Sequence, residues 1–526
     1  MNMKNIVALL LSIIVLGCQT KQKESIAIAE HKNQKPNIIY ILADDLGYGD
    51  VQSFNPVGKI PTPNLNDMSS NGTKFTNAYT SSSVCSPTRY SILTGRYNWR
   101  TELKSFVVSG YSKSLIKQER TTVAEMLKTQ GYHTAFIGKW HLGWDWEITK
   151  EDEKFSRDKL NARPEVDFSK PITNGPNSHG FDYTFGFCGS LDMAPYVYIE
   201  NNQPTMVPTK TTVSVDEKGV WREGVTSDDF NHATVLQDLT DKAVHYIDEN
   251  ANAEAPFFLY FPLPAPHTPI LPTTEFLGKS NTNMYGDFVM QVDDVVRQIR
   301  EALKKQGVSE NTMLVFTSDN GCSPRANFEE LAKVNHNPSY MFRGTKSDIY
   351  EGGLRVPFIV EWPAKVIKNL STDKMISTAD FFATSADIVG YQIEDTEGED
   401  SFSMLPLITG EKDNGIREYT VLHSLDGSFG IRKGNWKLNA CEGSGGWGYP
   451  NPRDIKNENL KLPVMQLYNL KDNIGETKNL ISEHPEIAAE LKAALKKIIL
   501  DGRSTPGAIQ KNDGMEGWTQ IEAIIN

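Results

Sequence analysis

The sequence predicts an α/β protein: a large, mainly parallel sheet sandwiched by helices, followed by a small antiparallel sheet with a packed helix. Three observations support this prediction. Continuous apolar runs that suit buried strands alternate with amphipathic stretches that suit helices. Polar residues follow directly after several of these runs, which places them on one edge of the sheet. Beyond about residue 417, the runs become short and are separated by turns.

The first predicted strand shows the pattern most clearly. Pro36-Asn-Ile-Ile-Tyr-Ile-Leu42 is almost wholly apolar and leads into Ala-Asp-Asp-Leu-Gly-Tyr-Gly, a glycine loop. The charged, irregular stretch 144–176 is expected to form an inserted loop. Further strands of the large sheet are expected at 73–79, 133–137, 257–261, 312–317 and 358–362. Apolar residues at helical spacing predict helices at 64–72, 122–131, 228–249 and 285–306.

Short strand candidates and one amphipathic stretch make up the end of the chain. They predict a small antiparallel sheet, one face of which is covered by a helix at 483–500. The strands of this sheet are expected at 419–423, 429–432, 436–438 and 466–469. The predicted organisation is a signal segment (1–17), a polar tether (18–35), a large domain (36–416) and a C-terminal subdomain (417–526).

The first residues resemble an export signal. The apolar run Ile6–Leu16 is too short to span a bilayer and fits a secretory segment. Val15-Leu-Gly-Cys18 resembles a bacterial lipobox, in which the cysteine is diacylated and becomes the mature N-terminus. We therefore expect an exported protein, anchored by lipid at Cys18 to the bacterial outer membrane and facing the periplasm or the cell surface. An ordinary signal peptide with an incidental cysteine is the alternative.

The overall charge excludes one class of partner. The net charge of −12 argues against non-specific nucleic-acid binding, which needs a basic face. It leaves room for a local cationic pocket that holds an anionic ligand.

The chain is organised around residues 85–96, Cys-Ser-Pro-Thr-Arg-Tyr-Ser-Ile-Leu-Thr-Gly-Arg. Pro87 and Gly95 indicate a loop that turns into a helix, with Ser86 or Thr88 available as the cap. A polar group at Cys85 would then face the positive end of the helix, where anions are favoured. A lone cysteine is more often inert, so the interpretation depends on the rest of the chain.

The remaining cysteines predict no cross-linked framework. Cys188, Cys322 and Cys441 are too few for a set of disulfides, although one bridge among them stays open. No Cys-x-x-Cys spacing typical of zinc sites is present.

Two pairs of oxygen donors lie at the ends of predicted strands. Asp44 and Asp45 follow the first strand, and Asp319 and Asn320 follow the strand at 312–317. Clustered carboxylate and amide oxygens suit a hard divalent cation, calcium before zinc. Either pair alone is a weak signal, because such residues after a strand more often form a turn.

Several cationic side chains occur in Gly- or Pro-rich segments just past strands. A metal ion together with fixed cations makes a pocket for a tetrahedral dianion, either phosphate or sulfate. The cationic candidates are Arg89, Lys139, His141, His267, Arg343 and Lys346.

At this point the chain resembles the type I sulfatases, the arylsulfatase branch of the alkaline-phosphatase superfamily. Cys85-Ser-Pro-Thr-Arg89 through Leu93-Thr-Gly-Arg96 matches the first signature of the family, with Thr88 where serine is commonest. Gly138-Lys-Trp-His-Leu-Gly143 matches the second. The likeness runs from about residue 36 to the C-terminal helix. It implies an alkaline-phosphatase-like fold and hydrolysis of sulfate esters.

The resemblance also implies that Cys85 is oxidised to Cα-formylglycine on the nascent chain. Pro87 and Arg89 are then the determinants that the formylglycine-generating enzyme reads. In the family the aldehyde hydrates to a gem-diol. One hydroxyl attacks sulfur in line with the ester oxygen, and the second lets the covalent sulfate leave.

The family roles carry over to matching positions. The ligands of one calcium ion would be Asp44, Asp45, modified Cys85, Asp319 and Asn320. Arg89, Lys139 and His141 would hold residue 85, with His141 as the base of the elimination step. His267 and Lys346 would bind the sulfate. His267 is the candidate acid for the leaving oxygen, although Lys139 and Lys346 remain alternatives. No role is carried over to Arg343 or Arg355.

The expected substrate is a sulfated poly- or oligosaccharide. Whether it is algal, such as ulvan or carrageenan, or an animal glycosaminoglycan does not follow from the sequence. The loops expected to set specificity are 144–177, 189–196, 322–338 and 443–453. Trp447 and Tyr449 in the last loop suit sugar stacking, but they suit ordinary packing equally well. The alternative functions are a phosphodiesterase or phosphonate hydrolase and a non-catalytic, sugar-binding lipoprotein.

Overall fold

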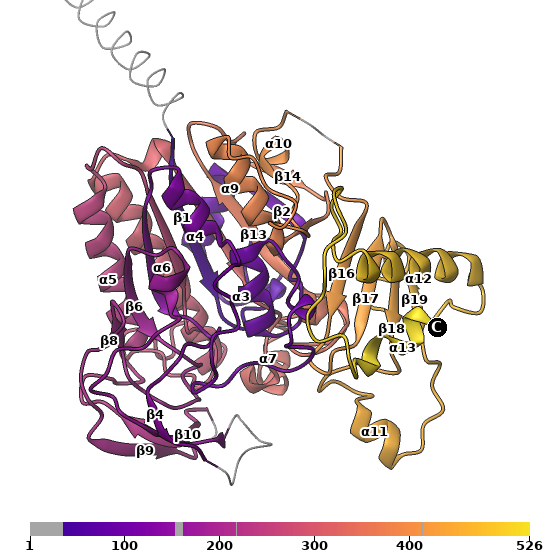
Figure 1. Ribbon diagram of the computed structural model, residues 1–526. Coiled ribbons are helices and arrows are strands. Elements are labelled where there is room, and N and C mark those ends of the chain that lie inside the picture. Colours follow the sequence, from indigo (N-terminus) through magenta and orange to yellow (C-terminus); the bar gives the residue numbers. More distant parts are fainter. Residues whose placement is uncertain (1–34, 153–160, 217, 412–413) are drawn as a thin grey trace, which may run out of the picture.

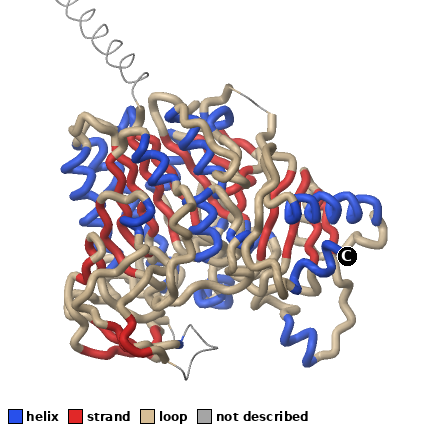
Figure 2. Tube along the Cα trace, in the orientation of Figure 1, coloured by secondary structure: helices blue, strands red, loops and turns tan. Residues whose placement is uncertain are grey.

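The computed structural model describes residues 35–152, 161–216, 218–411 and 414–526 (Figure 1). The expected signal segment, nearly all of the tether and Cys18 lie outside the described residues. Within them, a large sheet carries helices on both faces, and a smaller sheet follows from residue 419 (Figure 2). The predicted α/β fold is confirmed. Among the described helices, none combines the length and apolarity needed to cross a membrane.

The large sheet of the described chain has 11 strands. Its centre is a parallel block in the order β12, β1, β11, β3, β6, with antiparallel strands beyond it on both sides. Parallel strands end at the same edge, so the residues that follow them emerge side by side. In sheet order the strands are β14 (Leu370–Thr372), β2 (Thr73–Tyr79), β13 (Arg355–Glu361), β12 (Thr312–Ser318), β1 (Asn37–Ala43), β11 (Phe257–Pro262), β3 (His133–Lys139), β6 (Tyr183–Phe187), β7 (Ile199–Glu200) and β8 (Gln203–Pro204), while β15 (Ile376–Ser377) pairs with β2.

The side chains of β1 explain why both faces of the sheet are covered. Ile39 and Ile41 pack into one buried cluster, and Ile38 and Tyr40 pack into the other. A strand that is apolar on both faces needs a helical layer on each. The first cluster includes residues of α2 (Pro63–Asn71), α5 (Val235–Asn250) and α6 (Met284–Lys305). The second includes residues of α3 (Cys85–Thr94), α4 (Val123–Thr129) and α9 (Phe381–Val389).

Local sequence signals set several helix ends. Thr122 accepts the N–H of Glu125 at 3.1 Å in a capping box that begins α4. Asn283 accepts the N–H of Gly286 at 3.2 Å and begins α6. Gly390 ends α9 with a positive φ of 71°, a backbone conformation that glycine adopts without strain.

Two sequence expectations need correction. The helix expected from residue 228 begins at Val235, because Phe230 and His232 pack against aromatic neighbours and hold the preceding residues in turns. The stretch 144–176, expected to be an inserted loop, contains the antiparallel strands β4 (Ile148–Lys150) and β5 (Glu165–Val166).

The C-terminal subdomain is the predicted small antiparallel sheet with its helix. Leu491 and Leu495 of the helix pack against Ile431 and Leu438 of the sheet. The sheet consists of β16 (Tyr419–His423), β17 (Phe429–Lys433), β18 (Trp436–Ala440) and β19 (Gln466–Asn469), and α12 (Pro485–Leu500) covers it (Figure 1). The other elements are β9 (Lys210–Ser214), β10 (Trp221–Thr226), α7 (Phe328–Lys333), α8 (Glu351–Leu354), α10 (Leu405–Ile408), α11 (Pro452–Asn457) and α13 (Glu522–Ile525).

A buried ion cluster joins the two sheets. Lys437 of β18 contacts Glu351 of α8 at 3.1 Å and Glu476 at 2.9 Å, and all three side chains are fully buried. Glu476 also accepts the backbone N–H of Glu351 at 2.7 Å. Burial raises the pKa of Glu476, and the charge of Lys437 opposes that effect. The lysine therefore neutralises carboxylates contributed from both sides of the junction.

Replacing Lys437 by alanine should destabilise the protein strongly, because it leaves buried Glu476 without its cation and leaves Glu351 with Arg355 but without Lys437. We expect the free energy of unfolding to fall by about 3–5 kcal/mol. Chemical denaturation followed by circular dichroism measures this change. Lys433→Ala is the matched control, since that lysine lies on β17 and makes exposed ion pairs with Glu418 and Glu490. Equal midpoints for the two variants would contradict the role given to Lys437.

Candidate active site

The carboxyl edge of the parallel strands carries the acidic residues expected from the sequence. Asp44 and Asp45 follow β1, and Asp319 and Asn320 follow the neighbouring strand β12. The last residues of these two strands lie opposite each other in the ladder, so the two pairs leave the sheet side by side. All four residues are buried.

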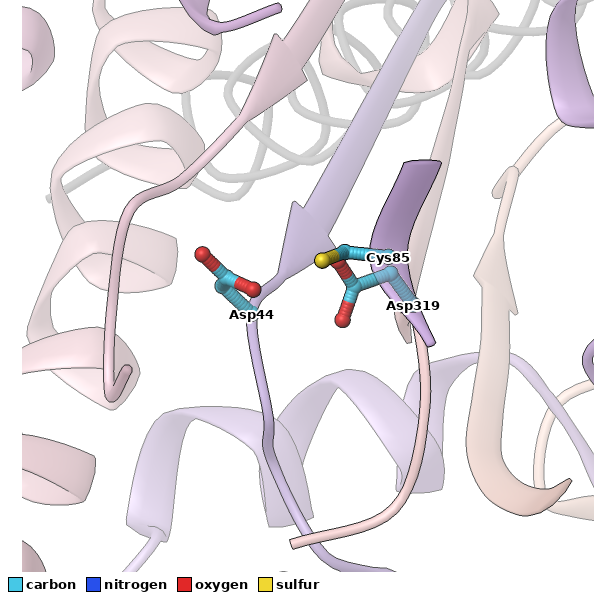
Figure 3. A group of neighbouring side chains, drawn as sticks. All are labelled: Asp44, Cys85 and Asp319. Atoms are coloured by element: carbon cyan, nitrogen blue, oxygen red, sulfur yellow. The ribbon is translucent and has the colours of Figure 1, made fainter. Parts of the chain in front are cut away.

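Cys85 joins the acidic cluster from the first turn of α3. Its Sγ and one carboxylate oxygen each from Asp44 and Asp319 lie within 4.8 Å of one another. Figure 3 shows the three side chains together, although they come from a strand end, a helix start and a second strand end. Cys85 is only 2% exposed. Burial raises the pKa of its thiol, against the effect of Lys139.

The cap predicted for α3 is wrong. The N-cap residue is Val84, which provides no side-chain acceptor. The hydroxyl of Thr88 donates to the carbonyl of Ser82 at 2.9 Å, and the Oγ of Ser86 accepts the N–H of Val108 at 3.3 Å. Both candidate caps are therefore used by neighbouring backbone groups. The positive end of the helix is left without a side-chain acceptor beside Cys85.

Arg89 donates hydrogen bonds to Asp319 of the acidic cluster. Its Nε and Nη2 donate to Oδ2 of Asp319 at 3.0 and 2.8 Å, and its Nη1 donates to the carbonyl of Lys139 at 2.8 Å. The distance from Nη2 to Oδ1 of Asp44 is 3.6 Å. Arg89 is fully buried, so its charge acts on both carboxylates with little screening by solvent.

Two lysines pair with the carboxylates of Asp44 and Asp45. Nζ of Lys139 lies 2.5 Å from Oδ2 of Asp44, and Nζ of Lys346 lies 2.7 and 2.9 Å from the two oxygens of Asp45. Although burial opposes charge on Lys346, Asp45 raises its pKa well above the ordinary value. Nδ2 of Asn320 also donates to Oδ1 of Asp45, at 2.7 Å. Lys346 is therefore held as a cation at this edge.

His141 is buried with one ring nitrogen free. Its Nε2 lies 2.9 Å from the carbonyl of Val108, so Nε2 carries the proton. Its Nδ1 is buried and has no hydrogen-bond partner. Burial, followed by the charges of Lys139 and Arg89, lowers the pKa of His141 well below the ordinary value. The neutral ring has one lone pair, on Nδ1, that can accept a proton.

His267 faces the cluster from the segment after β11. Its Nδ1 donates to the carbonyl of Thr268 at 2.6 Å, and its Nε2 lies 3.6 Å from Oδ2 of Asp45. Burial, followed by the charge of Lys346, lowers the pKa of His267. Because Nδ1 is engaged with the backbone, Nε2 is the ring atom available for proton transfer.

The donor set fits a hard divalent cation. Oδ1 of Asp44 and Oδ1 of Asn320 are buried without a hydrogen-bond donor, which is costly unless another ligand contacts them. Burial, followed by the charge of Asp44, raises the pKa of Asp319 to about 7. Burial would also raise the pKa of Asp44, but Lys139, His267 and Arg89 lower it well below the ordinary value. Crowded carboxylate oxygens with free lone pairs are the ligands that calcium prefers.

One carboxylate near the site, that of Asp192, was not predicted from the sequence. Asp192 lies four residues beyond Cys188, whose carbonyl accepts the N–H of His141 at 2.6 Å. The charge of His267 lowers the pKa of Asp192 against its burial, and Arg222 pairs with it. The apolar segment 183–187 immediately before this loop was the available signal. Arg343 and Arg355 lie elsewhere, where they contact Glu476 and Glu351 respectively.

The cysteines outside the site form no bridge. Cys188, Cys322 and Cys441 are all free thiols, as is Cys85. The disulfide left open by the sequence is absent among these described residues.

Fold and site together define a class of protein. A parallel sheet whose carboxyl edge gathers carboxylates, two lysines, an arginine and two histidines around one residue is suited to hydrolysing esters of tetrahedral anions.

Comparison with known proteins identifies the family. The Sulfatase family model matches residues 36–391. An N-acetylgalactosamine-6-O-sulfatase of Bacteroides thetaiotaomicron is 33% identical over 94% of this chain and 99% of its own length. Bovine arylsulfatase A is 28% identical over 92% of each chain. The structure of a 6S-sulfatase from work on glycosaminoglycan metabolism by Bacteroides thetaiotaomicron superposes with a TM-score of 0.75 at 31% identity, covering 89% of this chain and 99% of that one. The chain belongs to the sulfatase family and is a sulfuric ester hydrolase.

Arg89→Ala should destabilise the protein by about 3–5 kcal/mol, because it leaves buried Asp319 and Asp44 without their shared cation. Arg89→Lys should lose less, since it keeps a charge but cannot make the same set of hydrogen bonds. Denaturant unfolding in the presence of a chelator measures both. Arg325→Ala, at an exposed position nearby in sequence to Asp319, is the control and should change stability by less than about 0.5 kcal/mol. An Arg89→Ala protein as stable as this control would refute the assignment.

Proposed function

We propose that the protein removes sulfate from a sulfated carbohydrate by means of a formylglycine at position 85 and one calcium ion. The observation that carries the proposal is the burial of Cys85 beside Asp44 and Asp319, whose carboxylates pair with Lys139 and Arg89. A thiol with a raised pKa is a poor nucleophile. Conversion to the hydrated aldehyde supplies hydroxyl groups at the same place, one to attack sulfur and one to release it.

The residues present would hold calcium through Asp44, Asp45, Asp319 and Asn320, together with an oxygen of modified residue 85. When bound, the cation polarises the sulfate ester and offsets negative charge on residue 85. The free oxygens of Asp44 and Asn320 support this assignment.

The groups around residue 85 position it and move its proton. Arg89 and Lys139 each contact a carboxylate of the cluster, which fixes the cations beside position 85. His141 donates through Nε2 to a backbone carbonyl, so the free Nδ1 is the base that we assign to the elimination step. The fixed tautomer spares the ring any reorganisation during the reaction.

The groups on the other side of the cluster serve the sulfate and the leaving alcohol. Lys346, held as a cation by Asp45, binds the sulfate oxygens. His267 donates through Nδ1 to a backbone carbonyl, so Nε2 delivers a proton to the leaving oxygen from the doubly protonated ring. Asp45, 3.6 Å from Nε2, favours that charged form against the effects of burial and Lys346. Lys346 is less suited to that delivery, because its pKa is raised well above the ordinary value.

For the substrate, we propose an N-acetylgalactosamine 6-sulfate unit of a glycosaminoglycan, in preference to an algal polysaccharide such as ulvan. The relative named for N-acetylgalactosamine 6-O-sulfate hydrolysis shares 33% identity over nearly the whole of both chains, and this supports the choice. A structure solved in complex with k-i-k-neocarrahexaose shares only 24% identity, so it supports the fold and not a substrate.

We also propose the route by which the protein reaches its substrate. Residues 1–17 are a lipoprotein signal peptide and 18–35 a tether from lipidated Cys18 at the outer membrane. The catalytic domain then spans 36–416 and the C-terminal subdomain 417–526. The formylglycine-generating enzyme is the partner that must modify Cys85 before the sulfatase can be active.

Cys85→Ala should lower the turnover of N-acetylgalactosamine 6-sulfate to background, because no second residue supplies the pair of hydroxyls. Ion chromatography of released sulfate measures it. Cys322→Ala, which replaces another buried thiol, is the control and should stay active. In wild-type protein, the peptide holding residue 85 should have lost one sulfur and two hydrogens and gained one oxygen, which its intact mass reports. Full activity in Cys85→Ala would refute the mechanism, and activity only on a matched phosphate ester would refute the reaction.

Added calcium should raise the melting temperature, because the ion binds the folded carboxylate cluster. At a hundredfold excess over its Kd, the stabilisation should be about 2.7 kcal/mol. Differential scanning calorimetry after chelation, with and without calcium, measures the shift. The shift should vanish in Asp319→Ala and persist in Glu249→Gln, which alters an exposed carboxylate on α5. A shift that survives Asp319→Ala would place the ion elsewhere.

A further inference from the structure

Three aromatic side chains are strongly exposed in the part of the chain that the structure describes. They are Phe106 at 55%, Trp447 at 50% and Tyr449 at 63%. Trp447 is the one exposed member of the chain's nine tryptophans, all of which are described. An exposed tryptophan on a rigid support is typical of a binding surface. The contacts of Phe106 and Trp447 show where this surface lies.

Hydrogen bonds connect Phe106 and Trp447 through residues next to the catalytic lysine. The N–H of Phe106 donates to the carbonyl of Leu425 at 2.7 Å, and the N–H of Leu425 donates to the carbonyl of Ser347 at 3.1 Å. The N–H of Trp447 donates to Oγ of Ser347 at 2.8 Å. Ser347 directly follows Lys346. The two aromatic residues therefore flank the segment that carries the sulfate-binding lysine.

The same segment is joined to the cysteine side of the site. The N–H of Ser347 donates to the carbonyl of Ser83 at 2.8 Å, two residues before Cys85. The N–H of Ser83 donates to the carbonyl of His423 at 2.9 Å. Residues 83, 347 and 423–425 thus form one hydrogen-bonded border beside the reacting residue, and Phe106 and Trp447 attach to it.

The loop that carries Trp447 is held rigidly. The N–H of Gly448 donates to Oδ1 of Asp348 at 2.8 Å, and Oγ of Ser444 donates to the carbonyl of Gly448 at 2.6 Å. A Cβ at Gly446 would lie 2.4 Å from the carbonyl oxygen of Ser347, so only glycine permits this close approach. The backbone that carries the tryptophan is therefore already fixed before a ligand binds.

Phe106 adds an independent observation. Its φ is 61°, a left-handed conformation that is unfavourable for a bulky residue. The residue is also 55% exposed to solvent, so burial does not explain the strain. Strained residues of this kind concentrate at ligand-binding sites.

We infer that Phe106 and Trp447 form a sugar-binding subsite, stacking on the pyranose rings of the substrate while Lys346 holds its sulfate group. This inference rests on the proposed function and adds the residues that select a carbohydrate ester over other sulfate esters. The apolar C–H faces of a pyranose ring pack on aromatic faces, and its hydroxyls stay in contact with water or polar groups. Tyr449 is excluded from the subsite, because its hydroxyl donates to Glu458 at 3.0 Å, beyond α11.

The test measures kcat/KM for N-acetylgalactosamine 6-sulfate and the inhibition constant of inorganic sulfate, a probe that has no ring. Phe106→Ala and Trp447→Ala should each lower kcat/KM about tenfold or more, which corresponds to about 1.4 kcal/mol of lost binding. The sulfate inhibition constant should change less than about twofold. Trp447→Phe should retain most of the activity because it keeps an aromatic face. Tyr449→Ala is the matched control and should resemble the wild type.

The outcomes distinguish failure of the proposed subsite from failure of the proposed function. Unchanged kcat/KM in both alanine variants, or a parallel loss of sulfate inhibition, would overturn the subsite. The same holds if Tyr449→Ala loses as much activity as Trp447→Ala. A wild-type enzyme that desulfates no carbohydrate would instead overturn the proposed function. Melting temperatures of all variants exclude loss of folded protein as the cause.

Discussion

The arrangement of this site depends on one electrostatic constraint: carboxylates of like charge are packed together in the protein interior. Asp44, Asp45 and Asp319 share the end of two adjacent strands, where solvent cannot screen their repulsion. Arg89 and two lysines reach the cluster from three other segments and neutralise it. The same cations make a pocket for an anion, so the groups that permit folding also prepare the site for its substrate.

The small C-terminal subdomain belongs to the site as much as the large sheet does. Its β16 contacts the segment before Cys85 through the carbonyl of His423. Its loop 443–453 contacts Ser347, the residue after Lys346, through the N–H of Trp447. The buried Lys437 cluster fastens the same subdomain at a second point. The docking of the subdomain therefore also fixes the geometry of the active site. A substitution that loosens the junction should displace the residues at the carboxyl edge of the large sheet.

The sequence predicted the parts of the fold that have a strong local signal. The apolar runs of β1, β11 and β12 identified a parallel sheet, and polar residues just beyond them identified its active edge. The start of α5 was missed because the packing of Phe230 and His232 overrides helical spacing. The cap of α3 was missed because Ser86 and Thr88 bond to neighbouring backbone groups instead. Asp192, Val108 and Lys437 gain their partners only through tertiary contacts, which no local pattern records.

The complete burial of α3 has a consequence for the order of events during biosynthesis. Every residue of this helix, Cys85 to Thr94, is shielded from solvent, and Arg89 is tied to the acidic cluster. A modifying enzyme that must bind the segment around Cys85 has no access to it once the chain has folded. The proposed enzymatic oxidation of this cysteine would therefore have to precede folding, and the two processes would compete in time. Under the proposed formylglycine mechanism, a chain that folds first would be well packed but inactive, so the active fraction of a preparation would report the outcome of that competition.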